Sequence, residues 1–220
     1  MVTTEKPRCI KRVYDAIKES HIAVLAARTG VGKTTFALDM ATAFACDKKV
    51  LFFTVVEEMG RMVSSLKQHM DDKQLINISI LAEEKLNLET IQKNMLKENP
   101  GIAIIDYLQC FEVEDEKSVK AIMCCLKELA QEARAPIVVL SQLLRQADAR
   151  ERPIPCTDDM PQHRAIIPFA DTILLLYCDY SCSTMKRWCI VEKTPSGKIG
   201  KIPLNWDSEI GAFANLRKYE

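Results

Sequence analysis

Residues 22–46 place a glycine-rich loop between an apolar run and a helical segment. Ile22–Ala27 is apolar throughout, and Thr34–Cys46 carries apolar residues at the three- and four-residue spacing of a helix. The loop between them reads Arg-Thr-Gly-Val-Gly-Lys over residues 28–33. An apolar strand, a loop with two glycines and a Lys-Thr pair that opens a helix form the local architecture of a phosphate-binding P-loop. A unit of this kind belongs to α/β folds with a parallel sheet.

Each residue type in this loop has a part in holding phosphate. Gly30 and Gly32 allow the backbone to close around an anion, whose oxygens accept hydrogen bonds from loop N–H groups and from the start of the helix. Lys33 then contacts the β- and γ-phosphates of a nucleotide, and Thr34 holds Mg²⁺. Ala27 stands where the usual motif begins with Gly, a departure that leaves this chemistry unchanged. We therefore predict that ATP and Mg²⁺ bind at Arg28, Thr29, Gly30, Val31, Gly32, Lys33, Thr34 and Thr35.

A second apolar run ends in an acidic residue. Ile102–Ile105 is followed directly by Asp106. A carboxylate at the end of a strand can cap a turn, but a P-loop protein also needs an acid at the end of another core strand to hold the Mg²⁺ shell. Because Lys33 and Thr34 are present, Asp106 is predicted to be that metal-binding acid.

Two further strand ends carry polar residues that are candidates for acting on the phosphates. Val50–Val56 is followed by Glu57 and Glu58, and a carboxylate at this place can polarise the water that attacks the γ-phosphate. Spacing leaves the choice between the two open. The run Ile137–Leu140 leads through a serine to Gln142, which is either a sensor of the γ-phosphate or a simple turn former.

Short apolar runs alternate with helical segments over most of the chain, as in βαβ units around a parallel sheet. The expected strands are Ile22–Ala27, Val50–Val56, Asn77–Leu81, Gly101–Asp106, Pro136–Ser141 and Thr172–Tyr177, and the expected helices are Thr34–Cys46, Gly60–Met70, Leu88–Glu98 and Ser118–Ala133. Three later strands are expected to extend the sheet in antiparallel fashion: Arg187–Glu192, Lys198–Leu204 and Gly211–Leu216. The predicted fold is α/β, one doubly wound, mostly parallel sheet with an antiparallel C-terminal extension and helices on both faces.

Charge and cysteine content exclude other classes of protein. The 30 Lys and Arg residues balance 30 Asp and Glu residues, so no general attraction to nucleic acid or to anionic membranes is expected. The 9 cysteines are scattered and never spaced as Cys-x-x-Cys, which argues against a zinc site and suits a reducing compartment. No apolar run is long enough for a membrane helix, and the first residues lack a signal-peptide core. We therefore predict a cytoplasmic protein without a membrane contact.

Five blocks, in order and spacing, give the chain a resemblance to a known family. They are residues 27–38 around the P-loop, 51–59 leading to the two glutamates, 105–109 at Asp106, 140–143 at Gln142, and a last block made of 170–177 and 192–200. The chain resembles the motor domain of the DnaB-type hexameric replicative helicases, a branch of the RecA-like ATPases. The resemblance covers roughly Ile22 to Leu216, nearly the whole chain.

The resemblance implies a RecA-like P-loop NTPase. Its ATPase motor domain would span residues 21–220, after a short N-terminal helix or arm at residues 1–20. It implies Mg-ATP binding by Lys33, Thr34 and Asp106, catalysis by Glu57 or Glu58, and a Gln142 that links nucleotide state to DNA-binding loops. It also implies binding of single-stranded DNA, assembly into a homo-oligomer such as a hexameric ring, and protein partners.

One irregular segment falls where such motors carry loops that face a central channel. Residues 144–164 contain three prolines and show no period, which in a compact domain is typical of a functional loop. Arg145, Arg150 and Arg152 are therefore candidate contacts to single-stranded DNA phosphates. The alternative is a solvated loop, because the acidic residues Asp148, Glu151, Asp158 and Asp159 offset these arginines.

The last block departs from the family pattern. DnaB-type motors carry a Lys-x-Arg pair there that reaches into the nucleotide of the neighbouring subunit. This chain keeps Lys193, which the resemblance assigns to nucleotide binding, but has Pro195 in place of the arginine. Hydrolysis is then expected to be slow, or to use another cation such as Lys198 or Arg187.

The leading interpretation is an ATPase that couples Mg-ATP turnover to binding of, or movement on, single-stranded DNA. Two alternatives remain open at this point. One is a small partner-dependent ATPase, akin to the RadA or KaiC branches, that does not unwind DNA. The other is a binding or loading protein that uses ATP only as a conformational switch.

Overall fold

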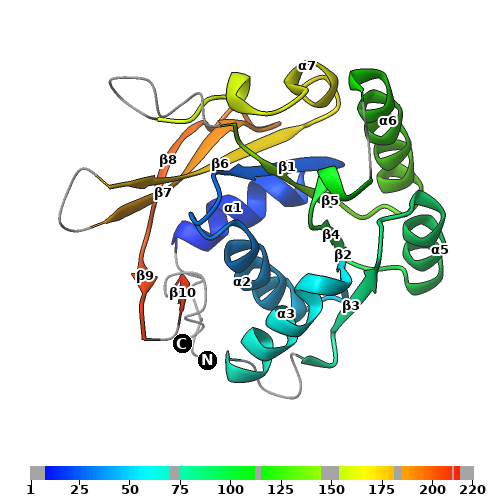
Figure 1. Ribbon diagram of the computed structural model, residues 1–220, viewed down its shortest axis with the longest axis horizontal. Helices are drawn as coiled ribbons and strands as arrows, with labels where there is room; N and C mark the ends of the chain where they lie inside the picture. Colours follow the sequence, from blue (N-terminus) through cyan, green and yellow to red (C-terminus); the bar gives the residue numbers. More distant parts are fainter. Residues whose placement is uncertain are drawn as a thin grey trace.

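An eight-stranded sheet runs through the centre of the computed structural model, which describes residues 8–69, 75–111, 115–144, 154–180, 185–209 and 211–213 (Figure 1). Its strand order is β3-β2-β4-β5-β1-β6-β7-β8. The strands are β1 Ile22–Ala27, β2 Val50–Val55, β3 Ile78–Glu83, β4 Ile102–Ile105, β5 Ile137–Gln142, β6 Thr172–Asp179, β7 Lys186–Lys193 and β8 Gly200–Leu204. Strands β1 to β6 pair in parallel, while β7 and β8 pair antiparallel. The mostly parallel sheet with an antiparallel extension is confirmed.

Helices cover both faces of this sheet, as predicted. One face carries α1 Arg8–Lys18, α2 Lys33–Ala45 and α3 Val56–His69, and the other carries α5 Leu88–Glu98, α6 Glu116–Glu132 and α7 His163–Ile166. Strand β1 is fully buried along its length, and its alternate residues belong to the two opposite cores. A strand whose neighbouring side chains both point into a core must be apolar at every position, which explains its unbroken apolar sequence.

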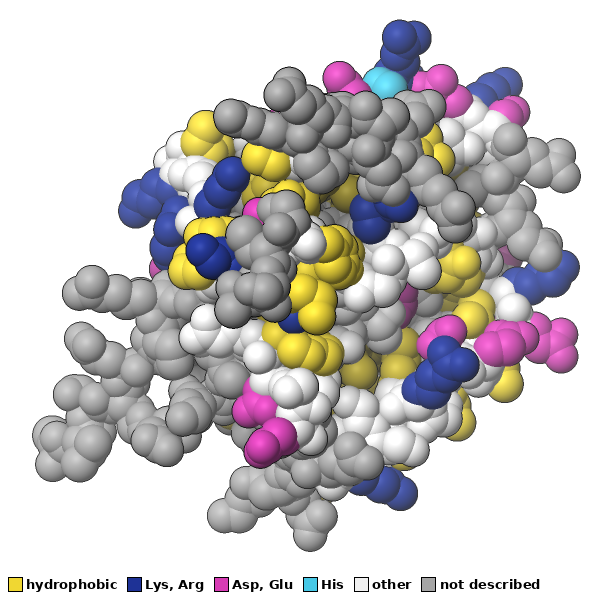
Figure 2. Space-filling view, turned by 60° about the vertical axis from the view of Figure 1, so that its left-hand side comes forward, with side chains coloured by type: hydrophobic (Ala, Val, Ile, Leu, Met, Phe, Trp, Pro, Cys, Tyr) yellow, Lys and Arg dark blue, Asp and Glu magenta, His cyan; other side chains and the backbone are white. Residues whose placement is uncertain are grey.

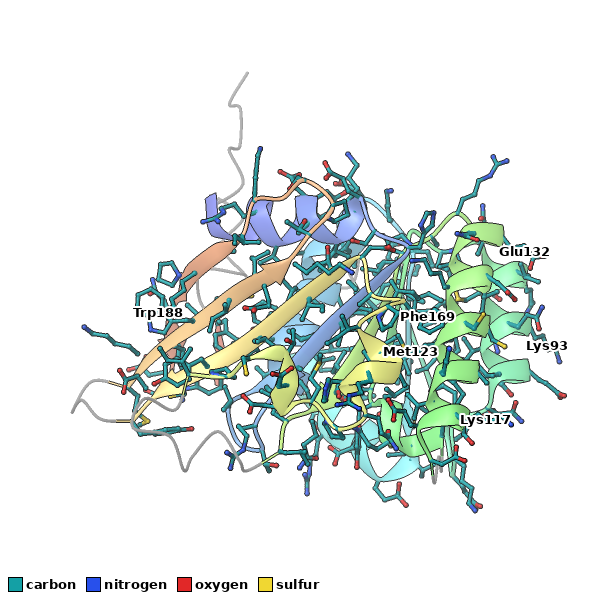
Figure 3. All side chains as sticks on the ribbon, turned by 90° about the horizontal axis from the view of Figure 1, so that it is seen from above. Lys93, Lys117, Met123, Glu132, Phe169 and Trp188 are labelled. Carbon is teal, nitrogen blue, oxygen red and sulfur yellow. The ribbon has the colours of Figure 1, made fainter. Side chains whose placement is uncertain are left out.

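The helices on the second face lie side by side in Figure 3. Met123 of α6 and Phe169, which follows α7, belong to the apolar core on this face, while Lys93, Lys117 and Glu132 point outward and are exposed. The described residues also form two short 3-10 helices, η1 Leu108–Phe111 and η3 Thr157–Asp159. Within the described ranges, no helix combines the length and the apolar character that crossing a membrane requires.

A cluster of polar groups closes the amino ends of β1 and β6. Asp171 accepts hydrogen bonds from the backbone N–H groups of His21 (2.9 Å) and Ile22 (3.0 Å) and from the Lys127 ammonium (2.8 Å). Burial of the Asp171 carboxyl raises its pKa, but the hydrogen bonds together outweigh burial, and the pKa lies below its ordinary value. Lys127 also donates to the carbonyl of Phe169 at 3.0 Å. The cluster therefore ties two central strands to α6.

Helix α3 begins at Val56 rather than at Gly60, so its predicted start was wrong. The β-branched Val56 continues the apolar run of β2, yet its side chain is 52% exposed and belongs to the helix. Glu57 and Glu58 consequently lie in the first turn of α3, which follows β2 directly. Carboxylates are stabilised there because the N-terminus of a helix carries partial positive charge.

The last predicted strand does not join the large sheet, which corrects the expected extension. The strands β9 Trp206–Asp207 and β10 Ala212–Phe213 pair antiparallel in a separate two-stranded sheet, and the rest of the predicted segment lies outside the described residues. Figure 1 shows β10 beside α2. The reason is tertiary packing, because the Phe213 ring is fully buried and packs edge-on against Phe36 of α2.

Candidate functional site

The glycine-rich loop joins β1 to α2 through two left-handed backbone positions. Gly30 has φ 82° and Gly32 has φ 101°, conformations that side chains with a Cβ disfavour. Gly32 also lies directly under the Phe213 ring, because a Cβ at this residue would come within 3.2 Å of a ring carbon. Its carbonyl accepts the Phe36 backbone N–H at 2.8 Å, which starts α2. The two glycines therefore allow a tight loop that leads directly into the N-terminus of α2, where backbone N–H groups can bind an anion.

Three predicted side chains converge at the end of this loop. The carboxylate of Asp106 accepts a hydrogen bond from Lys33 Nζ at 2.9 Å and another from Thr34 Oγ1 at 2.8 Å. Asp106 is 3% exposed, and its backbone N–H donates to the Phe53 carbonyl at 2.8 Å, which holds it at the end of β4. The Thr34 hydroxyl and the Asp106 carboxylate lie side by side and are both oxygen ligands, the kind that Mg²⁺ prefers.

A cavity of about 620 Å³ lies in front of these groups. Its volume is in the range of sites that enclose a small-molecule cofactor. The predicted residues among its lining are Arg28, Thr29, Gly30, Gly32, Lys33, Thr34, Thr35, Glu58, Asp106 and Gln142. Val31 differs, because its side chain is buried in the core on the α2 face. One continuous site thus gathers residues from β1, α2, α3, β4 and β5.

The structure separates the two glutamates that spacing left equivalent. Glu58 lines the cavity, whereas Glu57 is not among the described residues that do so. Glu58 also forms an ion pair with Arg61, one turn further along α3, at 3.8 Å. Arg61 lines the cavity as well, so the carboxylate and the guanidinium both face the space where a ligand would lie.

Gln142 connects the end of β5 to the loop. Its Nε2 donates to Thr29 Oγ1 at 2.9 Å. The parallel pairing of β5 with β1 places Gln142 beside Ala27, and this register brings the amide within reach of the loop. A change at either residue can therefore be passed to the other.

Sequence reasoning missed part of the lining. The unanticipated residues are Leu38, Arg61, Met62, Ser65, Tyr107 and Trp206. Tyr107 lies with its ring centroid 5.0 Å from Lys33 Nζ, and burial, with the nearby Cys110 and Asp106, raises the pKa of its phenol. Trp206 comes from the C-terminal hairpin, and no local motif announces it. In the sequence it falls between two predicted strands, Lys198–Leu204 and Gly211–Leu216.

The other basic residues predicted to act on nucleotide or DNA either are not among the residues that line the cavity or lie outside the described residues. Lys193 is at the end of β7, opposite Ile173 near the amino end of β6, and donates to the carbonyl of Ala170 at 2.5 Å. Arg187 stacks on Trp206, with its guanidinium carbon 4.7 Å from the ring centroid. The DNA-contact candidates Arg145, Arg150 and Arg152 lie outside the described residues.

Comparison with known proteins identifies relatives over most of the chain. A sequence model described as "DnaB-like helicase C terminal domain" matches residues 8–100 and 57–215. The Replicative DNA helicase DnaB of Haemophilus influenzae is 28% identical over 244 residues, which cover 91% of this chain and 52% of that protein. The protein of the same name from Rickettsia felis is 27% identical, with 90% and 54% covered. The chain thus spans about half the length of these curated relatives.

Solved structures show the same fold. A DnaB-like replicative helicase superimposes with a TM-score of 0.80 at 23% identity, covering 94% of this chain and 61% of that one. A KaiC-like protein from the archaeon Pyrococcus horikoshii OT3 gives a TM-score of 0.66 at 15% identity, with 88% and 91% covered. These likenesses bear out the predicted RecA-like architecture.

Proposed function

Because the chain belongs to the DnaB-like helicase C-terminal domain family, we propose that it is the ATP-hydrolysing motor unit of a DNA helicase. It couples Mg-ATP turnover to binding of, or movement along, single-stranded DNA. The observation that carries this proposal is the convergence of Lys33, Thr34 and Asp106 in front of a cavity of about 620 Å³. No observation in the described residues favours an ATPase that does not act on DNA.

At the phosphate-binding loop, Lys33 and Thr34 would exchange their hydrogen bonds to Asp106 for contacts to the nucleotide and its metal ion. Lys33 and Thr34 are bonded to Asp106, and both side chains line the cavity. With ATP in the cavity, the Lys33 ammonium would turn to the β- and γ-phosphates, and Thr34 and Asp106 would hold Mg²⁺. The metal supplies charge neutralisation at the phosphates. Loop N–H groups at the start of α2 bind the remaining phosphate oxygens.

Glu58 is the residue we assign to the attacking water. Its carboxylate lines the cavity at the first turn of α3, and it accepts the proton as the water oxygen bonds to the γ-phosphorus and ADP leaves. Gln142 reports the state of the γ-phosphate, since its amide is bonded to Thr29 in the loop. The segment 145–153 begins three positions later and carries the three arginines assigned to DNA.

An uncharged part of the cavity lining, which borders the loop at Gly32, suits the base of the nucleotide. Leu38, Met62 and Trp206 line it, and none of the three carries a charge. An aromatic ring gains contact energy from an offset or edge-on neighbour, so the Trp206 indole is a natural wall for a purine. The base would then lie against the C-terminal hairpin, while the phosphates lie against the loop.

DNA binding depends on more than the charge of one subunit. On the face in Figure 2, Lys and Arg side chains are interspersed with Asp and Glu rather than gathered in one patch. The net charge is +0, so affinity for DNA has to come from several subunits acting on one strand. We therefore include a homo-oligomer, such as a hexameric ring, in the proposal. A primase is a candidate protein partner, because the solved DnaB-like replicative helicase with this fold is described together with its interactions with primase.

The test is ATP turnover by the full chain with and without Mg²⁺ and a single-stranded oligonucleotide. We expect Mg²⁺-dependent hydrolysis that rises when the oligonucleotide is added, together with a larger particle in solution when nucleotide is present. Asp106→Asn serves as the matched variant, since it keeps the shape of the side chain and removes the metal-binding charge. A protein that binds no nucleotide under any of these conditions would contradict the proposal.

A further inference from the structure

We propose that Asp39, buried in α2, positions the aromatic wall of the nucleotide cavity by holding the hairpin β9–β10 against that helix. The inference rests on the proposed function, because it assigns Asp39 a part in binding the base of the nucleotide rather than its phosphates. Asp39 does not line the cavity itself, so it is a positioning residue that acts through Phe213 and Trp206.

The anchor is a buried hydrogen bond between distant parts of the chain. Asp39 is 0% exposed, and its Oδ2 accepts the backbone N–H of Phe213 at 2.9 Å. The hairpin strands β9 and β10 are two residues long each and pair with each other in a sheet of their own. A pair this short is not stable in isolation, so its position depends on what it packs against.

One face of α2 is shaped to receive this hairpin. Gly32, Phe36 and Asp39 stand at positions i, i+4 and i+7, which share a side of a helix. Phe213 contacts all three: its ring lies over Gly32 and edge-on to Phe36 (centroids 5.6 Å apart), and its backbone bonds to Asp39. The hairpin is therefore fixed to the same helix that begins at the phosphate-binding loop.

The contact continues from Phe213 into the cavity. The rings of Phe213 and Trp206 are edge-on with centroids 5.1 Å apart, and Trp206 lines the cavity. On another side the Arg187 guanidinium of β7 lies 4.7 Å from the Trp206 ring. The indole is held between these two neighbours, so a shift of Phe213 away from α2 would move the wall that faces the base. A wall held in place before binding avoids the entropic cost of ordering it.

The test compares a ligand that has a base with one that lacks it. Affinities for Mg-ATP and for Mg-tripolyphosphate are measured by calorimetry in wild type and in Asp39→Ala. Loss of a buried hydrogen bond to the hairpin should weaken ATP about tenfold. Tripolyphosphate affinity should stay within about twofold, since the loop keeps its own backbone conformation and the Phe36–Gly32 hydrogen bond, neither of which involves Asp39. Asp39→Asn should restore ATP affinity, because the amide oxygen can accept the same hydrogen bond.

Fluorescence gives an independent readout. The chain has two tryptophans, and Trp188 lies on β7 next to Arg187, on the opposite face of the sheet. In a Trp188→Phe background, Trp206 is the single emitter, and Figure 3 shows Trp188 on the outer side of the molecule. Asp39→Ala should shift the Trp206 emission to longer wavelength as the indole becomes more exposed. ATP should change the emission of the background protein more than tripolyphosphate does.

Two further variants keep the result interpretable. Thr42→Ala removes another buried polar group of α2, whose hydroxyl donates to the Leu38 carbonyl at 2.9 Å, and should leave both affinities unchanged. Phe213→Ala keeps the backbone N–H that bonds to Asp39 but removes the ring that joins Trp206 to α2, and it replaces Asp39→Ala if that variant does not fold. Equal weakening of both ligands, or no weakening of ATP, would overturn the positioning role alone. A wild type that binds neither ligand would overturn the nucleotide site and this inference with it.

Discussion

Two Lys–Asp pairs of nearly equal length lie at opposite edges of the sheet. At the carboxyl ends of the parallel strands, Lys33 and Asp106 are 2.9 Å apart. At the amino ends, Lys127 and Asp171 are 2.8 Å apart. Distance alone makes them equivalent, but their surroundings do not.

The difference lies in what else each carboxylate touches. Asp171 also accepts two backbone N–H groups, and Lys127 donates a second hydrogen bond to a backbone carbonyl, so the amino-edge pair is satisfied by fixed parts of the fold. Asp106 is bonded to Lys33 and Thr34, whose side chains face the cavity. The first arrangement stabilises the fold, whereas the second can exchange partners with a ligand. Position relative to the cavity, and not pair geometry, separates structure from function here.

Lys33→Ala should show the largest difference between the two Lys–Asp pairs, because it should abolish function while the fold persists. ATP affinity should fall at least about a hundredfold and turnover should become undetectable, because the ammonium is the charge that meets the phosphates. The free energy of unfolding should change less than ATP affinity does, since Thr34 still donates to Asp106 and the shortened side chain opens the carboxylate to water from the cavity. Calorimetry with Mg-ATP and urea unfolding of the same preparation measure both quantities. Unchanged ATP affinity would remove Lys33 from the site.

Replacing Glu57 and Glu58 singly by Gln tests which of them activates the attacking water at the carboxyl edge of the sheet. Glu58→Gln should lower turnover by about 10²–10⁴ while ATP affinity stays within a few-fold, because the carboxylate acts on water rather than on the bound nucleotide. Glu57→Gln is the matched control and should turn over ATP at the wild-type rate. Steady-state hydrolysis and calorimetry of both variants provide the measurement. The reverse result would assign catalysis to Glu57.

The carboxyl edge was predictable because its signals are local. Strand β1 and helix α5 begin and end at the predicted residues, and α5 has Asn87 as a side-chain cap and Asn99 in a left-handed conformation at its end. Lys33 and Thr34 were predicted from the glycine-rich loop after one apolar run, and Asp106 because it directly follows another. Such runs become parallel strands whose carboxyl ends meet at one edge of the sheet.

The parts that were not predictable depend on tertiary contacts. Glu57 and Glu58 are neighbours in sequence, but successive helical residues differ by about 100° in direction, so only the start of α3 decides which one faces the cavity. The C-terminal strand was expected in the large sheet because its composition suits a strand. Its place is set instead by Phe213 packing on α2, a contact between residues more than 170 positions apart.

The amino edge should respond in the opposite way to the carboxyl edge. Asp171→Ala removes the acceptor of three hydrogen bonds and should lower the free energy of unfolding by about 2 kcal/mol. Lys127→Met should cost about half as much, because Asp171 keeps its two backbone donors. Turnover by the folded fraction should be unchanged in both. Urea unfolding and ATP hydrolysis at the same temperature check this, and a selective loss of turnover would show that the amino edge contributes to the site.

The pH dependence of stability should give the smallest and most specific difference between the two edges. Burial raises the pKa of Asp171, but hydrogen bonds from Lys127 and two backbone N–H groups outweigh burial and leave the pKa below its ordinary value. A carboxyl whose pKa is lowered by folding stabilises the folded state above its unfolded pKa, which is about 3.9 for Asp. That contribution is lost as the pH falls through the folded pKa.

The stability advantage of wild type over Asp171→Asn should therefore be constant from pH 7 to about pH 5 and shrink below that. Urea unfolding of both proteins at steps between pH 7 and pH 3 measures it, and an advantage that persists unchanged at the acidic end would mean that the Asp171 charge does not contribute to holding β1 and β6 to α6.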